Sequence, residues 1–195
     1  GNANFSIMRH NNVFTPLQMG SGADPVITRR VQMAIWNIAG VAFIQRDSIN
    51  AISTARWNTW AVRWAAGQNS GFPQWSANES SFVNFLTGGA VTTAIATGGT
   101  AVMRFGATET GAEDYDGRLA HVQYFNAYLS QGEVAQAAIR PGSVQRGLLT
   151  YWPLNGDSPE LSFTRTALPG TVTGATFSGD SPAVNESFIV ALPSC

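Results

Sequence analysis

The amino-acid sequence predicts an all-β protein, a two-sheet antiparallel sandwich of the jelly-roll kind with one short helix near residues 131–140. Two observations carry this prediction. Short stretches in which apolar and polar residues alternate are separated, at intervals of about ten residues, by turn residues such as Gly88-Gly89 and Gly98-Gly99. In addition, 44% of the 195 residues are apolar and only 12% are charged, a balance that suits buried strands and argues against a disordered chain.

The clearest predicted strand spans residues 59–65, where Trp60, Val62 and Trp64 fall on one face with a period of two. Further strands are expected at residues 31–36, 41–46, 81–86, 91–96, 100–105, 118–126, 147–152, 171–177 and 187–192. The side chains expected to fill the space between the two sheets are Trp60, Val62, Trp64, Val122, Tyr124 and Trp152. Each buried apolar side chain of this size contributes about 2–3 kcal/mol to folding.

One short helix is predicted between the last strands. Ser130 and Glu133 have the Ser-x-x-Glu spacing of a capping box. Three residues at i, i+3 and i+4 give the helix one apolar face: Val134, Ala137 and Ala138. Pro141-Gly142 ends the helix.

The chain divides into two regions. Residues 1–25 are rich in Asn, Gly, Ser and Pro and are predicted to form an N-terminal arm or loosely held first strands, whereas residues 26–195 form the jelly-roll domain. The first residue is Gly1 in place of Met, which indicates a processed or trimmed chain, or a piece of a longer one. Cys195 is the only cysteine, so an intrachain disulfide is excluded.

Composition and motifs argue against several classes of protein. The net charge is −1 and no basic excess is present, so we expect no nucleic-acid partner. No apolar run reaches about 18 residues, so we expect no membrane insertion. No strand carries the two carboxylates, roughly 5 to 9.5 Å apart, that glycosidases use. We therefore expect a protein that is not an enzyme, with a glycoside hydrolase as the less favoured alternative.

An acidic loop at residues 106–117 is the candidate metal site. Glu113, Asp114 and Asp116 place hard oxygen ligands close together, which favours calcium as the one possible cofactor. The alternative is a solvated loop without metal. His121 is expected to be a packed or hydrogen-bonded strand residue, because two isolated histidines make no zinc site.

Aromatic residues in polar loops are the candidate glycan site, because sugars stack on aromatic rings while amides and carboxylates bind their hydroxyls. The residues of this type are Phe72, Trp75, Asn78, Tyr115 and Asp116, and Asn69 is expected to supply a further hydrogen bond. The alternative for Trp75 is that it covers the edge of the sandwich or contacts a neighbouring subunit. The sequence leaves both interpretations open.

The order of several motifs resembles the closing half of laminin-G-like and concanavalin A-like modules. The stretches that carry the resemblance are residues 105–106, 115–126 (YDGRLAHVQYFN), 129–130, 133–134 and 147–154 (GLLTYWPL), with Trp57 and residues 60–62 (WAV) upstream. The resemblance covers roughly residues 57–177 and implies a jelly roll. This chain departs from the family pattern at Ala120-His121, where relatives have two aspartates, so any metal-binding role of those acids is not carried over to this chain. The two phases of Leu119 and Val122 predict a β-bulge at this same point.

The stretch at residues 153–184 is similar to the tails of phage and marine viral structural proteins that carry this module. We therefore expect a structural and binding module on a virion surface or outside the cell, of the capsid-decoration or tail-fibre type. Its expected partners are other copies of itself, capsid or fibre proteins, and surface glycans. The alternatives are a free-standing lectin and a cell-surface adhesion protein.

Overall fold

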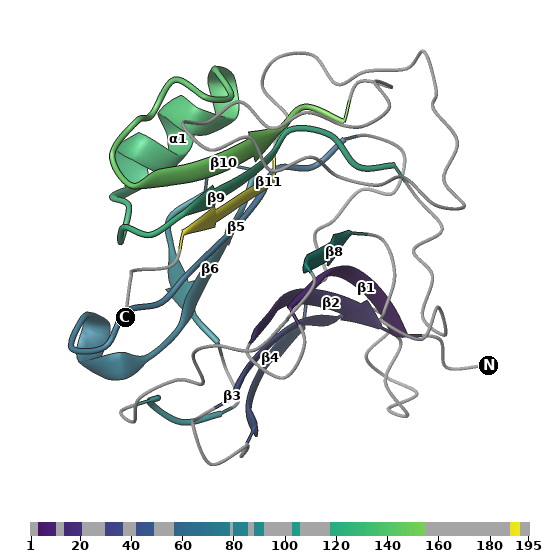
Figure 1. The fold of residues 1–195 in the computed structure, drawn as a ribbon. Helices are drawn as coiled ribbons and strands as arrows, with labels where there is room; N and C mark the ends of the chain where they lie inside the picture. Colours follow the sequence, from purple (N-terminus) through teal and green to yellow (C-terminus); the bar gives the residue numbers. More distant parts are fainter. Residues whose placement is uncertain are drawn as a thin grey trace.

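A computed structural model gives the fold of this chain. It describes residues 4–10, 14–20, 30–36, 42–48, 57–78, 80–85, 88–91, 103–105, 118–154 and 188–191. Within these residues the protein is all-β, with two sheets and one short α-helix, as the sequence predicts (Figure 1).

The first sheet has five strands, every neighbouring pair of which is antiparallel. In chain order the strands are β1 (Asn4–His10), β2 (Phe14–Gly20), β3 (Arg30–Trp36), β4 (Ala42–Ser48) and β8 (Met103–Phe105), and their spatial order is β4-β3-β2-β1-β8. Residues 4–20 of the expected arm therefore pair as strands with β3 and β8. The division into arm and domain near residue 25 stays a prediction.

The second sheet has six strands in the order β10-β9-β11-β5-β6-β7. They are β5 (Trp60–Arg63), β6 (Gln74–Ala77), β7 (Val83–Asn84), β9 (Val122–Phe125), β10 (Leu148–Trp152) and β11 (Phe188–Ala191). The expectation of antiparallel pairing fails at one strand, because β11 runs parallel to both of its neighbours, β5 and β9. The other pairs in this sheet are antiparallel.

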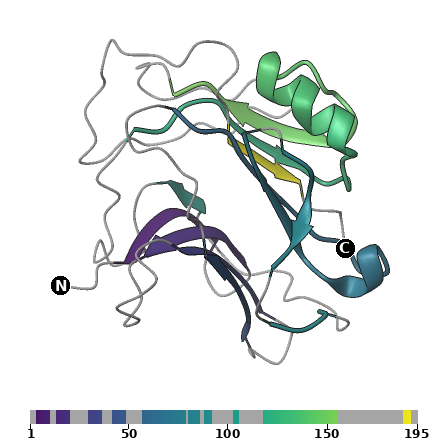
Figure 2. The same cartoon turned by 180° about the vertical axis from the view of Figure 1, so that it is seen from behind.

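The helix α1 (Gln131–Ile139) covers the outer face of the six-stranded sheet, and the five-stranded sheet lies on the other side (Figure 2). The predicted capping box is confirmed, since the Ser130 hydroxyl accepts a hydrogen bond from the Glu133 amide while the Glu133 carboxylate accepts from the Ser130 amide. The apolar stripe is confirmed as well, because Val134, Ala137 and Ala138 are fully or almost fully buried. In the part of the chain that the structure describes, no helix has the length and apolarity to cross a bilayer.

Two cores lie on the two faces of the six-stranded sheet. Strand alternation turns Trp60, Val62, Val122 and Trp152 away from α1, and all four are buried, as predicted. Trp152 contacts Phe105 of the five-stranded sheet edge to face, with ring centroids 5.1 Å apart. The core beneath the helix is formed by Ala61, Phe125, Leu129, Val134, Ala137, Ala138 and Val144. Trp64 is also buried, whereas Tyr124 keeps part of its surface exposed.

The irregularity predicted at Ala120-His121 takes another form. His121 adopts a left-handed backbone with φ of 55°, and β9 begins at the next residue. The register shift lies instead in the partner strand β10, between Leu148 and Thr150. A left-handed residue just before a strand turns the chain into the sheet without an extra residue in the ladder.

Candidate functional site

Three polar side chains form a straight row across one end of the six-stranded sheet. Arg63 ends β5, Gln74 begins β6 and Asn84 ends β7, and the strand register pairs Arg63 with Gln74 and Gln74 with Asn84. Paired residues of adjacent strands point to the same face of a sheet. The row lies on the face that carries α1, because Arg63 contacts Leu129 just before that helix. We call Arg63, Gln74, Phe82, Asn84 and Tyr128 the Arg63 cluster.

The guanidinium of Arg63 is fixed by three hydrogen bonds. Nε and Nη2 both donate to the Gln74 Oε1 atom, at 3.0 and 2.8 Å, and Nη1 donates to the Leu129 carbonyl at 2.6 Å. Both acceptors are neutral. Among the described residues no carboxylate lies within ion-pair distance of Arg63. Three of the five N–H donors of the guanidinium are used, which leaves one on each Nη nitrogen.

Two aromatic rings hold the same guanidinium. Its Cζ lies 3.7 Å from the ring centroid of Phe82 and 4.5 Å from that of Tyr128, both within cation–π range. Partial burial lowers the pKa of Arg63, an effect that the nearby Tyr128 opposes. Burial likewise raises the pKa of Tyr128, and the positive charge of Arg63 opposes that rise. Arginine has so high an ordinary pKa that the guanidinium stays charged.

Amide groups continue the row toward the solvent. The Gln74 Nε2 and Asn69 Nδ2 atoms both donate to Asn84 Oδ1, at 3.0 and 2.7 Å. The Tyr128 hydroxyl donates to Gln74 Oε1 at 2.7 Å, so this oxygen accepts from Tyr128 and Arg63 together. Asn69 and Asn84 are exposed. The arrangement presents a chain of fixed amides beside two aromatic rings and a cation.

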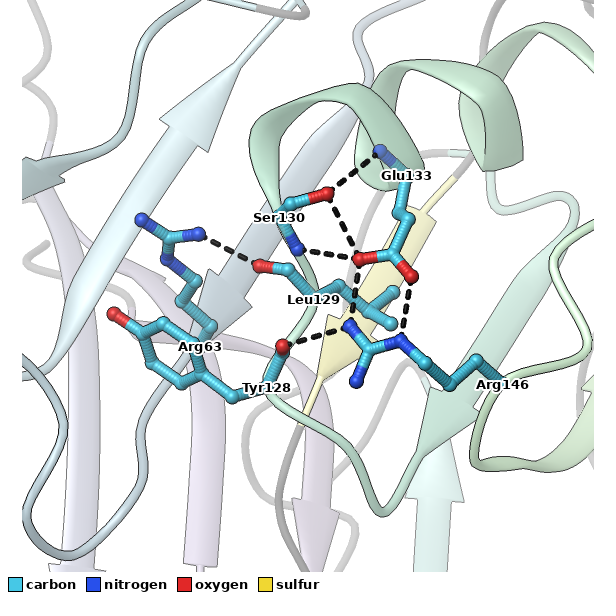
Figure 3. Close-up of polar contacts among 6 residues, drawn as sticks. All are labelled: Arg63, Tyr128, Leu129, Ser130, Glu133 and Arg146. Atoms are coloured by element: carbon cyan, nitrogen blue, oxygen red, sulfur yellow. Dashed lines mark hydrogen bonds and ion pairs between the residues drawn. The ribbon is translucent and has the colours of Figure 1, made fainter.

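A second arginine fixes the segment that carries Tyr128 and Leu129, and the two guanidinium groups approach this segment from different sides (Figure 3). Arg146 forms an ion pair with Glu133, with Nε 2.6 Å from Oε1, and donates from Nη2 to the Tyr128 carbonyl at 2.9 Å. The hydrogen bond from Arg146, joined by hydrogen bonds from the Ser130 amide and hydroxyl, outweighs the opposing effect of burial and lowers the pKa of Glu133 to about 2. Arg146 therefore has an internal counter-ion, whereas Arg63 has none among the described residues.

The segment before β7 is tied to the helix by Gln131. Its Nε2 donates to the Ser80 carbonyl at 2.7 Å, and its Oε1 accepts from the Phe82 amide at 3.1 Å. These two bonds hold the Phe82 ring in place beside Arg63. The cluster is thus assembled from the sheet, the loop before the helix and the helix itself.

Trp75, the leading sequence candidate for a sugar platform, lies elsewhere. It is in β6, opposite Val62, on the face turned away from α1. Its ring stacks on Trp60 with centroids 5.9 Å apart and lies 6.4 Å from Phe85. Trp75 thus packs beside Trp60 in the strand next to the edge strand β7, and its role as a sugar platform or as a cover for the sandwich edge stays a prediction.

Asn78 and Phe72 lie outside the strands and form hydrogen bonds with neighbouring residues of the chain. The Asn78 side chain accepts from the Thr59 amide at 3.1 Å and donates to Asn58 at 3.1 Å, which supports its left-handed backbone at the end of β6. The Phe72 carbonyl accepts from Asn69 at 2.9 Å. The contacts described for these two residues concern the backbone of Phe72 and the side chain of Asn78, and a glycan site at Phe72, Trp75 and Asn78 stays a prediction.

The other predicted site residues lie outside the described residues: Tyr115 and Asp116 for glycan, and Glu113, Asp114 and Asp116 for calcium. Within the described ranges, no three acidic, histidine or cysteine side chains gather in a way that could hold a metal ion. His121 is partly buried, as expected, and its Nδ1 lies 2.9 Å from the Tyr151 hydroxyl. Burial lowers the pKa of His121 and so favours the neutral ring.

The sequence patterns missed the Arg63 cluster, although one trace of it was visible: an arginine alternating with tryptophans in a strand otherwise free of charge. No motif in the sequence identified its partners Gln74, Phe82 and Tyr128. No protein-family model, no curated protein and no solved structure matches this chain.

Proposed function

We propose that this chain is a non-enzymatic binding module that attaches to surface glycans from the outside of a virion or cell. The observation that carries the proposal is the Arg63 cluster, in which exposed amides stand beside the rings of Phe82 and Tyr128. Sugars are bound by this combination, because aromatic faces take the C–H side of the ring and amides match the hydroxyls. In this proposal the glycan site lies at the end of strands β5, β6 and β7, which differs from the location expected from the sequence.

The concanavalin A-like jelly roll is part of the same proposal. Three features support it: the two sheets, the helix between β9 and β10, and the position of β5 in the same sheet as those strands. The parallel strand β11 departs from an antiparallel jelly roll, but it lies after residue 177, beyond the stretch that carries the resemblance. In this proposal β11 is an addition to the module. Assembly with copies of itself and with capsid or fibre proteins remains the proposed context.

The carboxylates among the described side chains offer little support for the alternative function of a glycoside hydrolase. Glu133 is the one carboxylate among the side chains that the structure describes, and it is occupied by Arg146 and Ser130. The acids of the 106–117 loop lie outside the described residues. A binding function needs none of these groups.

A glycan array tests this proposal with the wild-type chain and two amide variants. Asn84→Ala removes an exposed amide of the cluster, and Gln136→Ala removes an exposed amide on α1 as the matched control. We expect the wild type to bind a subset of glycans, Asn84→Ala to bind them about tenfold more weakly, and Gln136→Ala to bind as the wild type does. An array on which no glycan binds, or on which Asn84→Ala is unaffected, would overturn the proposal.

A further inference from the structure

Arg63 carries a positive charge that the described part of the protein does not neutralise. Its three hydrogen bonds go to a neutral amide and a neutral carbonyl, and two aromatic rings lie within cation–π distance of it. Arg146, on the other side of the segment Tyr128–Ser130, shows the usual solution, a direct ion pair with Glu133 at 2.6 Å. A fixed and partly desolvated guanidinium without a carboxylate favours an anion from outside the chain.

The geometry suits a planar anion. Gln74 and the two rings hold the guanidinium in one orientation, so little side-chain entropy is lost when a ligand binds. One N–H on each Nη nitrogen is not used within the cluster. The Asn84 Nδ2 amide, two positions along the row, makes no hydrogen bond within the described residues and adds a further donor.

Resting on the proposed glycan binding, we infer that the Arg63 cluster recognises the carboxylate of an acidic sugar, a uronic or sialic acid. The carboxylate pairs with Arg63, and the ring and hydroxyls of the sugar meet Phe82 and the amides of Asn84 and Asn69. An acidic peptide would also satisfy the charge. The row of amides beside an aromatic ring favours the sugar, because amides match hydroxyl groups that a peptide side chain of Asp or Glu lacks.

The test compares ligands that differ only in charge. Oligogalacturonate and the same oligomer with its carboxyl groups methyl-esterified are titrated against the full chain, and sialyllactose is compared with its carboxyl methyl ester. We expect one acidic sugar to bind at least about tenfold more tightly than its neutral counterpart, with an advantage that shrinks as salt is added. Arg63→Gln should abolish the difference between the two ligands.

A second variant keeps the inference testable if Arg63→Gln does not fold. Asn84→Asp leaves every contact of Arg63 in place, removes the Nδ2 donor and adds a negative charge at an exposed position of the row, so it should weaken the acidic ligand by more than the neutral one. Arg140→Gln removes an exposed arginine at the end of α1 and should change neither ligand. Thermal melting of each variant reports whether it is folded.

The outcomes separate this inference from the proposed function. Equal binding of acidic and neutral sugars overturns the recognition of carboxylate and leaves glycan binding standing. Absence of binding to any glycan overturns both. An octapeptide of glutamate that competes as well as the acidic sugar overturns the choice of sugar over peptide.

Discussion

At the scale of single residues, the most constrained position near the site is Gly147, at the entrance to β10. Its φ is +69°, and its carbonyl accepts a hydrogen bond from the Asn126 amide at 2.8 Å. A Cβ atom there would lie 2.5 Å from the Ala127 Cβ and 2.7 Å from the Asn126 Oδ1. Both the backbone conformation and the space therefore require glycine.

We predict that Gly147→Ala lowers the free energy of unfolding by about 2–4 kcal/mol, through backbone strain and overpacking together. Chemical denaturation followed by circular dichroism measures the change. Gly132→Ala is the matched control: it lies in α1, a Cβ there meets nothing within 4 Å, and alanine favours the helix by up to about 1 kcal/mol. Equal denaturation midpoints for Gly147→Ala and Gly132→Ala would contradict the conclusion that position 147 requires glycine.

At the scale of elements, α1 shows what local sequence determines. Its N-cap, its apolar stripe and its end lie within about a dozen residues, and all were predicted because capping and helical period are local properties. The pairing of β11 was not predictable in the same way. Its partners are residues 60–63 and 122–125, far away along the chain, and a short apolar strand does not encode which neighbour it joins or in which direction.

The same element gives a prediction about pH. The pKa of Glu133 is lowered to about 2 by Arg146 and Ser130, against an ordinary value of 4.5. A carboxylate with a lowered pKa in the folded state stabilises fully above its unfolded pKa and loses this contribution as the pH falls toward its folded pKa. We therefore expect the wild type to be more stable than Glu133→Gln at pH 6, by less than about 1 kcal/mol because the pair is partly exposed.

That difference should shrink below pH 4.5 and vanish near pH 2. Denaturation midpoints of both proteins at several pH values measure it, and glutamine keeps the capping hydrogen bond so that the charge alone is tested. Arg146→Gln, which removes the partner, should show the same convergence with the wild type. A gap that stays constant from pH 6 to pH 2 would show that the ion pair does not set the pKa of Glu133.

At the scale of the whole molecule, the candidate site depends on contacts that no sequence pattern contains. Arg63 reaches Gln74 over 11 residues and Leu129 over 66 residues. Strand alternation in the sequence places Arg63 on the face opposite the tryptophans, which is correct. The segment before α1 covers this face and so creates the site. This contact results from the packing of parts of the chain that are far apart in the sequence, and no local pattern predicts it.

The role of residues 1–25 also depends on the architecture of the whole molecule. In the spatial order β4-β3-β2-β1-β8, strands β1 and β2 lie between β3 and β8, so their removal leaves an isolated hairpin of β3 and β4. A lone hairpin is marginally stable at best. The face of the six-stranded sheet that carries Trp60, Val62, Val122 and Trp152 would then lose the layer opposite it.

We predict that deletion of residues 1–25 abolishes cooperative unfolding and gives large, polydisperse particles, because a broad apolar face becomes exposed. Circular dichroism during heating and light scattering measure the two effects. Deletion of residues 1–3, which ends before β1, is the control and should behave as the full chain does. A shortened chain that melts cooperatively at the wild-type temperature with a single defined mass would mean that residues 1–25 are an arm that the domain does not need. A defined oligomer of the full chain that becomes a stable monomer on deletion would assign those residues to assembly.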